Sequence, residues 1–269
     1  MIYIMTHKET DIPSIDNYIP LLVGGVNHPD LFGLYESDDS GDNISYKNDS
    51  YCELTGLYWM WKNTSHRFLG LVHYRRFFAE VHRLLKIKDV YYSVGAPSYR
   101  IYEENELISK LESKELLVIE SPKLPWGNRK ILESVTGSEI WTDLDTLIKT
   151  NYPEYFEYYI VSCQNHNHIQ CNMFFGNRTL VEEYCKWIFT LLDSLDKMHV
   201  ENTGDRYHNR ELGYIAELLF DVWIKRNRVT YEVVDCIVTS NSNNDQHQIK
   251  RIWKLPKDLL RNAYQWIER

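Results

Sequence analysis

Short apolar runs alternate along this chain with longer segments whose apolar residues recur every three or four positions. Runs rich in Ile, Leu, Val and aromatic residues, each stopped by polar or turn-forming residues, predict strands at residues 2–5, 18–23, 68–72, 116–119, 171–175 and 231–238. Amphipathic spacing predicts helices at residues 51–62, 103–114, 142–149, 180–195 and 209–224. Strands that alternate with helices indicate an α/β fold with a central, mostly parallel sheet flanked by helices.

Turn and cap signals divide the first half of the chain. Gly24 and Gly25 predict a turn after the second strand, and residues 36–50 are rich in Ser, Asp, Asn and Gly, which predicts a loop. Thr142 is a suitable N-cap for the helix that follows it. We expect residues 1–240 to form one domain and residues 241–269 to form a polar loop and a C-terminal amphipathic helix.

The C-terminal segment is basic, although the whole chain has a formal net charge of −8. Its cations are Arg251, Lys254, Lys257, Arg261 and Arg269. They flank an apolar face made of Leu259, Leu260, Ala263, Tyr264 and Ile267. Such a helix is typical of a peripheral contact with an anionic membrane surface. The alternative, a helix that docks on its own domain, is the more common use of an apolar stripe.

Composition excludes several classes of protein. The negative net charge disfavours a nucleic-acid binder, which needs many Lys and Arg contacts to phosphate. Five cysteines without CxxC spacing disfavour a disulfide framework and structural zinc, and indicate a reducing cytoplasm. We expect no signal peptide and no membrane-spanning segment. The 20 Tyr, 8 Trp and 9 Phe suit a protein that stacks on sugars or bases.

The most informative motif is His73-Tyr-Arg-Arg76, which directly follows the apolar run at residues 68–72. In open α/β sheets ligands bind beyond the carboxyl ends of the strands, so these donors are expected at the ligand edge. Arginine suits a diphosphate because its planar guanidinium makes bidentate, charge-assisted hydrogen bonds. The alternative is that one arginine pairs with a carboxylate and the other is solvated.

Other polar clusters are weaker signals. Asn43 and Ser45 offer side-chain donors and acceptors, but a capped turn explains them equally well. Asn172 lies in a predicted strand, where it can reach a sugar hydroxyl or bond the backbone at the sheet end. Asp143-Leu-Asp145 is formally a metal-binding DxD motif, yet it opens a helix, where acidic residues are favoured anyway. The GxSxG, GxGxxG and GxxxxGK[ST] motifs are absent, which disfavours serine hydrolases, dinucleotide-binding enzymes and P-loop enzymes.

Several strings together resemble the bacterial capsular and exopolysaccharide glycosyltransferases long filed as a domain of unknown function. The strings are Thr6-His7-Lys8, Ile19-Pro20, Gly41-Asp-Asn-Ile-Ser45 with Lys47-Asn48, Tyr51-Cys-Glu-Leu-Thr55, Tyr58-Trp-Met-Trp-Lys-Asn63, Leu71-Val-His-Tyr-Arg-Arg-Phe77, Asn172-Met-Phe174, Glu183-Tyr-Cys-Lys-Trp187 and Arg210…Gly213-Tyr-Ile-Ala-Glu217. They cover nearly the whole chain.

The resemblance implies a GT-A-like fold and the transfer of a sugar, galactofuranose in some members, from a UDP-sugar onto a glycan or a lipid-linked oligosaccharide. It implies donor-binding roles for Thr6, His7, Asn43, Ser45, His73, Asn172 and Arg210. Because His73-Tyr-Arg-Arg76 occupies the place where GT-A enzymes carry DxD, we expect Arg75 and Arg76 to stabilise the leaving diphosphate without a metal. No cofactor is expected, although Mn²⁺ stays open.

The catalytic base of an inverting transfer is a carboxylate. Asp143 is the first choice for this role and Glu217 the second. Glu217 has an alternative, structural role in which it pairs with Arg210 or Arg76. Two other functions stay open at this point: a non-catalytic module that binds nucleotide-sugars or carbohydrates, and a phosphate-transferring enzyme that uses the same basic residues.

Overall fold

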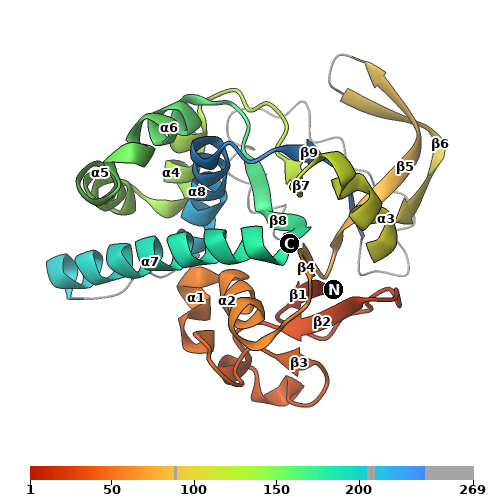
Figure 1. Cartoon of the computed structure of the whole chain (residues 1–269), viewed down its shortest axis with the longest axis horizontal. Coiled ribbons are helices and arrows are strands. Elements are labelled where there is room, and N and C mark those ends of the chain that lie inside the picture. The colour runs from red at the N-terminus through yellow and green to blue at the C-terminus, as the bar shows by residue number, and fades with distance from the viewer. Residues whose placement is uncertain (88–89, 205–206, 208–209, 240–269) are drawn as a thin grey trace.

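The structure, a computed structural model, describes residues 1–87, 90–204, 207 and 210–239; residues 81–87 and 90–98 are described by their backbone alone. The predicted unit at residues 241–269, with its amphipathic helix, lies outside the described residues. Figure 1 shows the arrangement of the helices around a single sheet, with a long hairpin that projects from one side.

Within the described residues, ten strands form the sheet, and its main path runs in the order β3-β2-β1-β4-β8-β7-β9. The strands of this path are β1 (Ile2–Thr6), β2 (Tyr18–Leu22), β3 (Glu36–Ser37), β4 (Phe68–His73), β7 (Leu116–Glu120), β8 (Ile169–Asn177) and β9 (Tyr231–Val233). The β3-β2-β1-β4 block and the β7-β9 pair are parallel, whereas β8 is antiparallel to both β4 and β7. The predicted α/β fold is confirmed, with one reversed strand between two parallel blocks.

Three further strands branch from the carboxyl end of β4. They are β5 (Arg76–Ile87), β6 (Val90–Ile101) and β10 (Cys236–Val238). Strands β5 and β6 form the projecting antiparallel hairpin, and β10 pairs with the first residues of β5, with Val238 opposite Arg76. The hydrophobic pattern did not predict this hairpin.

Eight α-helices surround the sheet in the described part of the chain. They are α1 (Asn48–Tyr51), α2 (Leu54–Asn63), α3 (Glu104–Lys110), α4 (Asn128–Thr136), α5 (Glu139–Asn151), α6 (Pro153–Gln164), α7 (Arg178–Thr203) and α8 (Glu211–Asn227). In Figure 1, the long helix α7 separates α1 and α2 on one side from α4, α5, α6 and α8 on the other.

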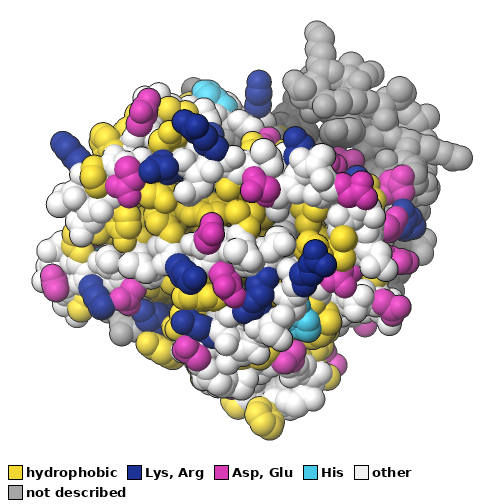
Figure 2. All heavy atoms as spheres, viewed as in Figure 1, with side chains coloured by type: hydrophobic (Ala, Val, Ile, Leu, Met, Phe, Trp, Pro, Cys, Tyr) yellow, Lys and Arg dark blue, Asp and Glu magenta, His cyan; other side chains and the backbone are white. Residues whose placement is uncertain are grey.

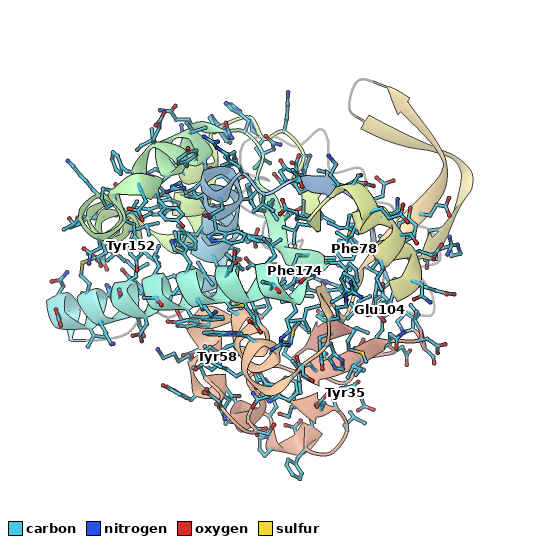
Figure 3. All side chains as sticks on the ribbon, in the orientation of Figure 1. Tyr35, Tyr58, Phe78, Glu104, Tyr152 and Phe174 are labelled. Carbon is cyan, nitrogen blue, oxygen red and sulfur yellow. The ribbon has the colours of Figure 1, made fainter. Side chains whose placement is uncertain are left out.

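Strands β1, β4, β7 and β8 are buried on both faces. Their successive side chains enter two different cores because side chains alternate along a strand. Tyr3 and Met5 of β1 belong to the larger core under α2, α7 and α8, whereas Ile2 and Ile4 belong to the smaller core near β5 and α3. On β8, Phe174 belongs to the larger core and contacts Phe220 of α8 edge-on. Figure 3 places Phe174 beside α7, with Tyr58 on the opposite side of that helix.

Three predicted boundaries are wrong. The helix predicted from residue 51 is interrupted because Cys52 has a positive φ of 50°, so α2 begins at Leu54. Thr142 lies inside α5, whose N-cap is Ser138. The strand predicted at 231–238 is two strands, because β9 pairs with β7 and β10 pairs with β5.

No helix in the described ranges is both long enough and apolar enough to cross a membrane. Acidic and basic side chains are interspersed over the face shown in Figure 2, with apolar side chains between them.

Candidate functional site

The carboxyl ends of β1 and β4 lie side by side because these strands are parallel neighbours, with Met5 opposite His73. The chain leaves β4 with the Tyr74 amide donating to the Met5 carbonyl at 3.0 Å. The His7 ring meets the Tyr74 ring edge-on at 5.5 Å, and the Lys8 ammonium lies 5.1 Å from the same ring. The motif after β4 and the polar residues after β1 therefore form one cluster.

The antiparallel strand β8 brings its first residues to the same edge. His73 Nε2 is 2.8 Å from the Cys171 carbonyl oxygen, so this nitrogen donates and carries a proton. Burial lowers the pKa of His73; Arg76 and Arg210 lower it further, while Glu53 opposes the shift. His73 is therefore a neutral hydrogen-bond donor at neutral pH.

Strand β8 is irregular at this point. Cys171 and Asn172 have φ values of 61° and 49°, and the pairing with β7 shifts register between Val118 and Glu120. Non-glycine residues in the left-handed region cost about 1–3 kcal/mol each and cluster at functional sites. The bulge turns the buried Asn172 side chain toward Glu53, to whose Oε1 it donates at 2.8 Å, and toward the Gly213 carbonyl at 3.2 Å.

Helix α8 begins at the same place. Arg210 precedes it in a left-handed conformation, with φ 68°, and its amide donates to the Asp49 carbonyl at 2.8 Å. A side chain at Gly213 would meet Cys52 Sγ at 3.0 Å, so glycine permits the close approach of α8 to the α1–α2 junction. Arg210 influences the pKa of both His7 and His73 and therefore belongs to the cluster.

The cluster is cationic. Desolvation lowers the pKa of His7 to about 4, and the charges of Lys8, Arg210, His28 and Arg75 act in the same direction. His7 is therefore neutral at neutral pH, and the positive charge comes from the lysine and arginines. In a chain whose net charge is −8, this local excess of cations favours an anionic ligand.

Thr6 is at this edge, but its side chain binds locally. The Thr6 hydroxyl is buried and donates to the Lys8 carbonyl at 2.7 Å, which fixes the turn that presents His7 and Lys8. Thr6 thus shapes the loop after β1.

Asn43 and Ser45 fasten the loop that follows β3. Asn43 donates to the carbonyls of Asp39 and Gly41 and accepts from the Ser45 amide. The Ser45 hydroxyl donates to the fully buried Asp38. The carboxylate of Asp38 also accepts from the amides of Gly24 and Gly25, at 2.9 and 3.0 Å.

The structure does not bring Asp143 into the cluster. Asp143 lies on α5, where its carboxylate accepts from Tyr207 at 2.7 Å, His199 at 3.3 Å and Asn202 at 3.5 Å. These three partners come from α7 and from Tyr207, not from the ends of β1 and β4. The sequence predicted that Asp143 opens a helix, but it lies inside α5, which begins at Glu139.

Asp145, the second carboxylate of the DxD string, is also held by neighbours. Arg129 Nη1 donates to both of its oxygens at 2.8 Å, and the Tyr159 hydroxyl donates at 2.6 Å. These contacts do not fit a metal ligand. Among the residues that the structure describes, no group of three or more His, Cys, Asp or Glu side chains is arranged to hold a metal.

Glu217 lies closer to the cluster than Asp143 does. It is buried on α8, one turn after Gly213, and its charge contributes to the raised pKa of the Cys171 thiol, which is caused mainly by burial. Its hydrogen-bond partner is His168, whose Nε2 is 3.3 Å from Glu217 Oε2. His168 is buried just before β8 and also contacts Asn128, so it belongs to a structural network.

Two residues of the cluster were missed by sequence reasoning. Lys8 is adjacent to His7, and its position after β1 was a usable signal. Glu53 lies in the Tyr51-Cys-Glu-Leu-Thr55 string, but the sequence assigned its carboxylate no role, because it meets the site through Asn172 across 119 positions of sequence.

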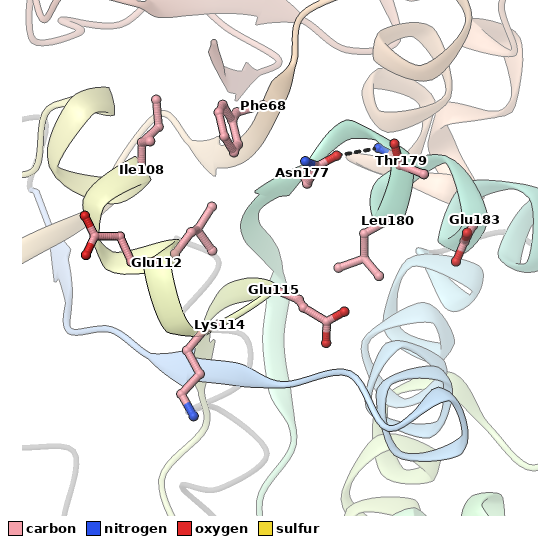
Figure 4. Close-up of a pocket in the computed structure, with 10 residues that line it drawn as sticks. Phe68, Ile108, Glu112, Lys114, Glu115, Asn177, Thr179, Leu180 and Glu183 are labelled. Carbon is pink, nitrogen blue, oxygen red and sulfur yellow. Dashed lines mark hydrogen bonds between the residues drawn. The ribbon is translucent and has the colours of Figure 1, made fainter.

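A groove of about 590 Å³ lies at the opposite edge of the sheet (Figure 4). It includes Phe68, the first residue of β4, and Asn177, the last residue of β8. Ile108 and Glu112 face it from the α3 side, and Leu180 faces it from α7. The groove is thus separated from the cationic cluster by the length of the strands.

One solved structure with the same fold is the apo form of the bifunctional glycosyltransferase WbbM. The two share 24% sequence identity with a TM-score of 0.67 over 94% of this chain. The chain spans about half of that protein, since the match covers 47% of it. This likeness identifies the sheet as GT-A-like, with the His73-Tyr-Arg-Arg76 motif at the carboxyl end of β4.

None of the curated proteins matches the chain. Residues 1–228 match the model of the family described as domain of unknown function DUF4422. This range includes every residue of the cationic cluster. The chain belongs to the DUF4422 family.

Proposed function

We propose that this protein is a glycosyltransferase that moves a hexose from a UDP-sugar to a hydroxyl group of a glycan. The observation that carries the proposal is the convergence of Arg75, Arg76 and Arg210 with His7 and His73 at the ligand edge of the sheet. Guanidinium groups match the geometry of a diphosphate. The likeness in fold to WbbM and the motifs shared with polysaccharide glycosyltransferases support the same activity.

In the proposed reaction, the acceptor oxygen forms a bond to the anomeric carbon of the donor sugar. The bond from that carbon to the diphosphate oxygen breaks, and its electron pair leaves with UDP. Arg75, Arg76 and Arg210 stabilise the charge that develops on the diphosphate. The N–H of the neutral His73 donates to the Cys171 carbonyl and positions the ring. Direct displacement inverts the anomeric configuration.

The acceptor's proton passes to a carboxylate that lies within hydrogen-bonding reach. The charge of Glu217 acts on the Cys171 thiol of β8, whereas the Asp143 carboxylate accepts from Tyr207 and His199. We propose Glu217 ahead of Asp143, which reverses the order that the sequence suggested. Comparison of kcat for Glu217→Gln and Asp143→Asn tests this order.

We propose that the reaction needs no metal, because the motif resemblance assigns the arginines to the place of the DxD carboxylates and because Arg129 and Tyr159 bind Asp145. Activity should persist in EDTA. Loss of activity in EDTA with recovery on addition of Mn²⁺ would contradict the proposal.

The finer substrate assignments rest on the motif resemblance. We propose capsular or exopolysaccharide synthesis as the context, galactofuranose or another hexose as the donor sugar, and a glycan or lipid-linked oligosaccharide as the acceptor. Thr6, His7, Asn43 and Ser45 are proposed to line the nucleotide pocket, with the last two shaping its loop.

Release of UDP from a panel of UDP-sugars, with and without a polysaccharide acceptor, tests the activity. Release that depends on acceptor is the expected result. The second candidate is a module that binds nucleotide-sugars without turnover. It is favoured by the observation that both candidate bases, Asp143 and Glu217, already accept hydrogen bonds from neighbouring side chains. Saturable UDP-sugar binding with no release would select the module.

A further inference from the structure

Glu53 is a buried carboxylate whose charge acts on His73 of the cluster, and it has no part in the proposed reaction. It is only 8% exposed and lies directly before α2, next to the left-handed Cys52. Its Oε1 accepts from Asn172 at 2.8 Å, and Asn172 also donates to Gly213. Three segments distant in sequence therefore meet at Glu53 and Asn172.

A structural role for Glu53, in which it only joins these segments, does not require a charge. The amide oxygen of a glutamine would accept the same hydrogen bond from Asn172, and burying a carboxylate instead costs desolvation. The charges of Glu53, Arg76 and Arg210 all act on the His73 ring, so cations lie near this carboxylate. A carboxylate beside a cationic ligand site is suited to accept a hydrogen bond from a hydrogen-bond donor of that ligand.

Asn172 provides a second, independent observation. It is 2% exposed, and its Oδ1 has no hydrogen-bond partner among the described residues. Buried acceptors are nearly always paired, so an unpaired one at a strained bulge indicates a partner that comes from outside the chain. The missing partner is a hydrogen-bond donor.

The polar groups at this edge are thus separated by type. Arg75, Arg76 and Arg210 offer donors, which suit the oxygens of a diphosphate. Glu53 and Asn172 Oδ1 offer acceptors, which suit hydroxyl groups. The part of a nucleotide-sugar that carries hydroxyl donors and adjoins the diphosphate is the sugar.

We propose that Glu53 and Asn172 form the subsite that binds a hydroxyl group of the donor sugar, and that Glu53 thereby determines which sugar is accepted. The proposal rests on the proposed function, because it assumes a nucleotide-sugar ligand. It adds a specificity-determining role for Glu53, which lies in the Tyr51-Cys-Glu-Leu-Thr55 string but receives no role from the resemblance. Glu53 contacts the sugar and leaves the diphosphate to the arginines.

Calorimetric titration with UDP alone and with UDP-glucose, UDP-galactose, UDP-N-acetylglucosamine and UDP-galactofuranose tests the subsite. The Glu53→Gln variant should bind UDP at least as tightly as wild type, because a negative charge near the diphosphate is lost. Its affinity for the UDP-sugar that wild type prefers should fall by about tenfold or more relative to UDP, because the site can no longer pair the hydroxyl with a carboxylate. Glu154→Gln, at an exposed position on α6, is the matched control and should behave as wild type.

The Asn172→Gly variant gives a second route to the same answer, because glycine accepts the left-handed conformation of residue 172. It should also keep UDP binding and lose the preference for the sugar. If either folded variant keeps the wild-type ratio of the two affinities, or loses UDP and UDP-sugar in equal proportion, Glu53 and Asn172 are only structural and the inference is overturned. If wild type binds neither UDP nor any of these sugars, the proposed function itself fails.

Discussion

Arg75, Arg76 and Arg210 reach the ligand edge by different routes. The first two come shortly after β4. Their backbone is fixed by β10 and the residue after it: Val238 lies opposite Arg76, and the Thr239 amide donates to the Arg75 carbonyl at 2.8 Å. Arg210 arrives from the start of α8 in a left-handed conformation. The backbone at these positions is therefore held by hydrogen bonds before any ligand binds, which is the preorganisation that electrostatic catalysis requires.

Replacement of Arg75 or Arg76 by alanine should lower kcat for UDP release by about 10²-fold, the usual effect of removing one preorganised charge stabiliser. Arg67→Ala is the matched control, because Arg67 precedes the amino end of the same strand and lies against Phe68. It should change kcat little. Equal losses in all three variants would show that the arginines act through stability alone.

His7 should make stability depend on pH. Its pKa is about 4 in the folded protein, below the ordinary 6.5, so the unfolded chain takes up this proton first as the pH falls. The contribution of His7 to stability is present above pH 6.5 and is lost as the pH falls toward 4. Tm of wild type should therefore drop more steeply than Tm of His7→Gln across this window, and parallel curves would refute the shifted pKa.

At the scale of residues, an apolar run shows where a strand ends. The sequence therefore predicted that His7 follows β1 and that His73, Arg75 and Arg76 lie at the carboxyl end of β4. Glu53 was not predictable in this way, since its role depends on a bulge at Asn172 and on the approach of Gly213. Those contacts exist only in the folded chain.

At the scale of elements, the loop after β3 depends on one buried carboxylate. Asp38 accepts hydrogen bonds from the amides of Gly24 and Gly25 and from the Ser45 hydroxyl, so it joins two loops beside the carboxyl end of β2. Its own amide donates to Leu22 at 3.0 Å. These loops include the residues proposed to line the nucleotide pocket.

Asp38→Ala should lower the free energy of unfolding by about 2–4 kcal/mol, because two buried N–H groups lose their acceptor. Asp39→Ala removes a less buried neighbour and should change it by less than about 0.5–1 kcal/mol. Urea titration measures both. Similar effects of the two substitutions would exclude the fastening role of Asp38.

The sequence predicted an element correctly where a clear apolar run or a clear helical spacing of apolar residues was bounded by polar residues. Strands β1, β4 and β7 and helices α7 and α8 are such cases. The hairpin of β5 and β6 was missed because residues 76–101 mix charged, aromatic and apolar residues without a clear period. The direction of β8 could not be predicted, since strand polarity depends on how the chain crosses the sheet.

At the scale of the whole molecule, the C-terminal segment follows shortly after β10, the strand that pairs with β5 beside the arginines. The described chain passes Arg75 and Arg76 at β10 before it enters residues 240–269. The basic and apolar pattern of that segment predicts a contact with anionic membranes, which stays a prediction because the segment lies outside the described residues.

Co-sedimentation with vesicles tests the membrane contact. Full-length protein should pellet with vesicles that contain anionic lipids at low salt, because basic residues near the surface are attracted to them. A chain ending at Gln248 should stay in the supernatant, and neutral vesicles serve as the control. If both chains pellet equally, the segment has no membrane role.

The central claim is that cations at the ends of β1 and β4 bind the diphosphate of a nucleotide-sugar. Calorimetric titration of UDP in the presence of EDTA measures this directly for wild type, Arg76→Ala and Arg67→Ala. Wild type and Arg67→Ala should bind UDP at millimolar concentration or below without metal, and Arg76→Ala should bind at least about tenfold more weakly, as expected for the loss of a charge-assisted contact. Absence of UDP binding in wild type, or equal binding in all three proteins, would contradict the claim.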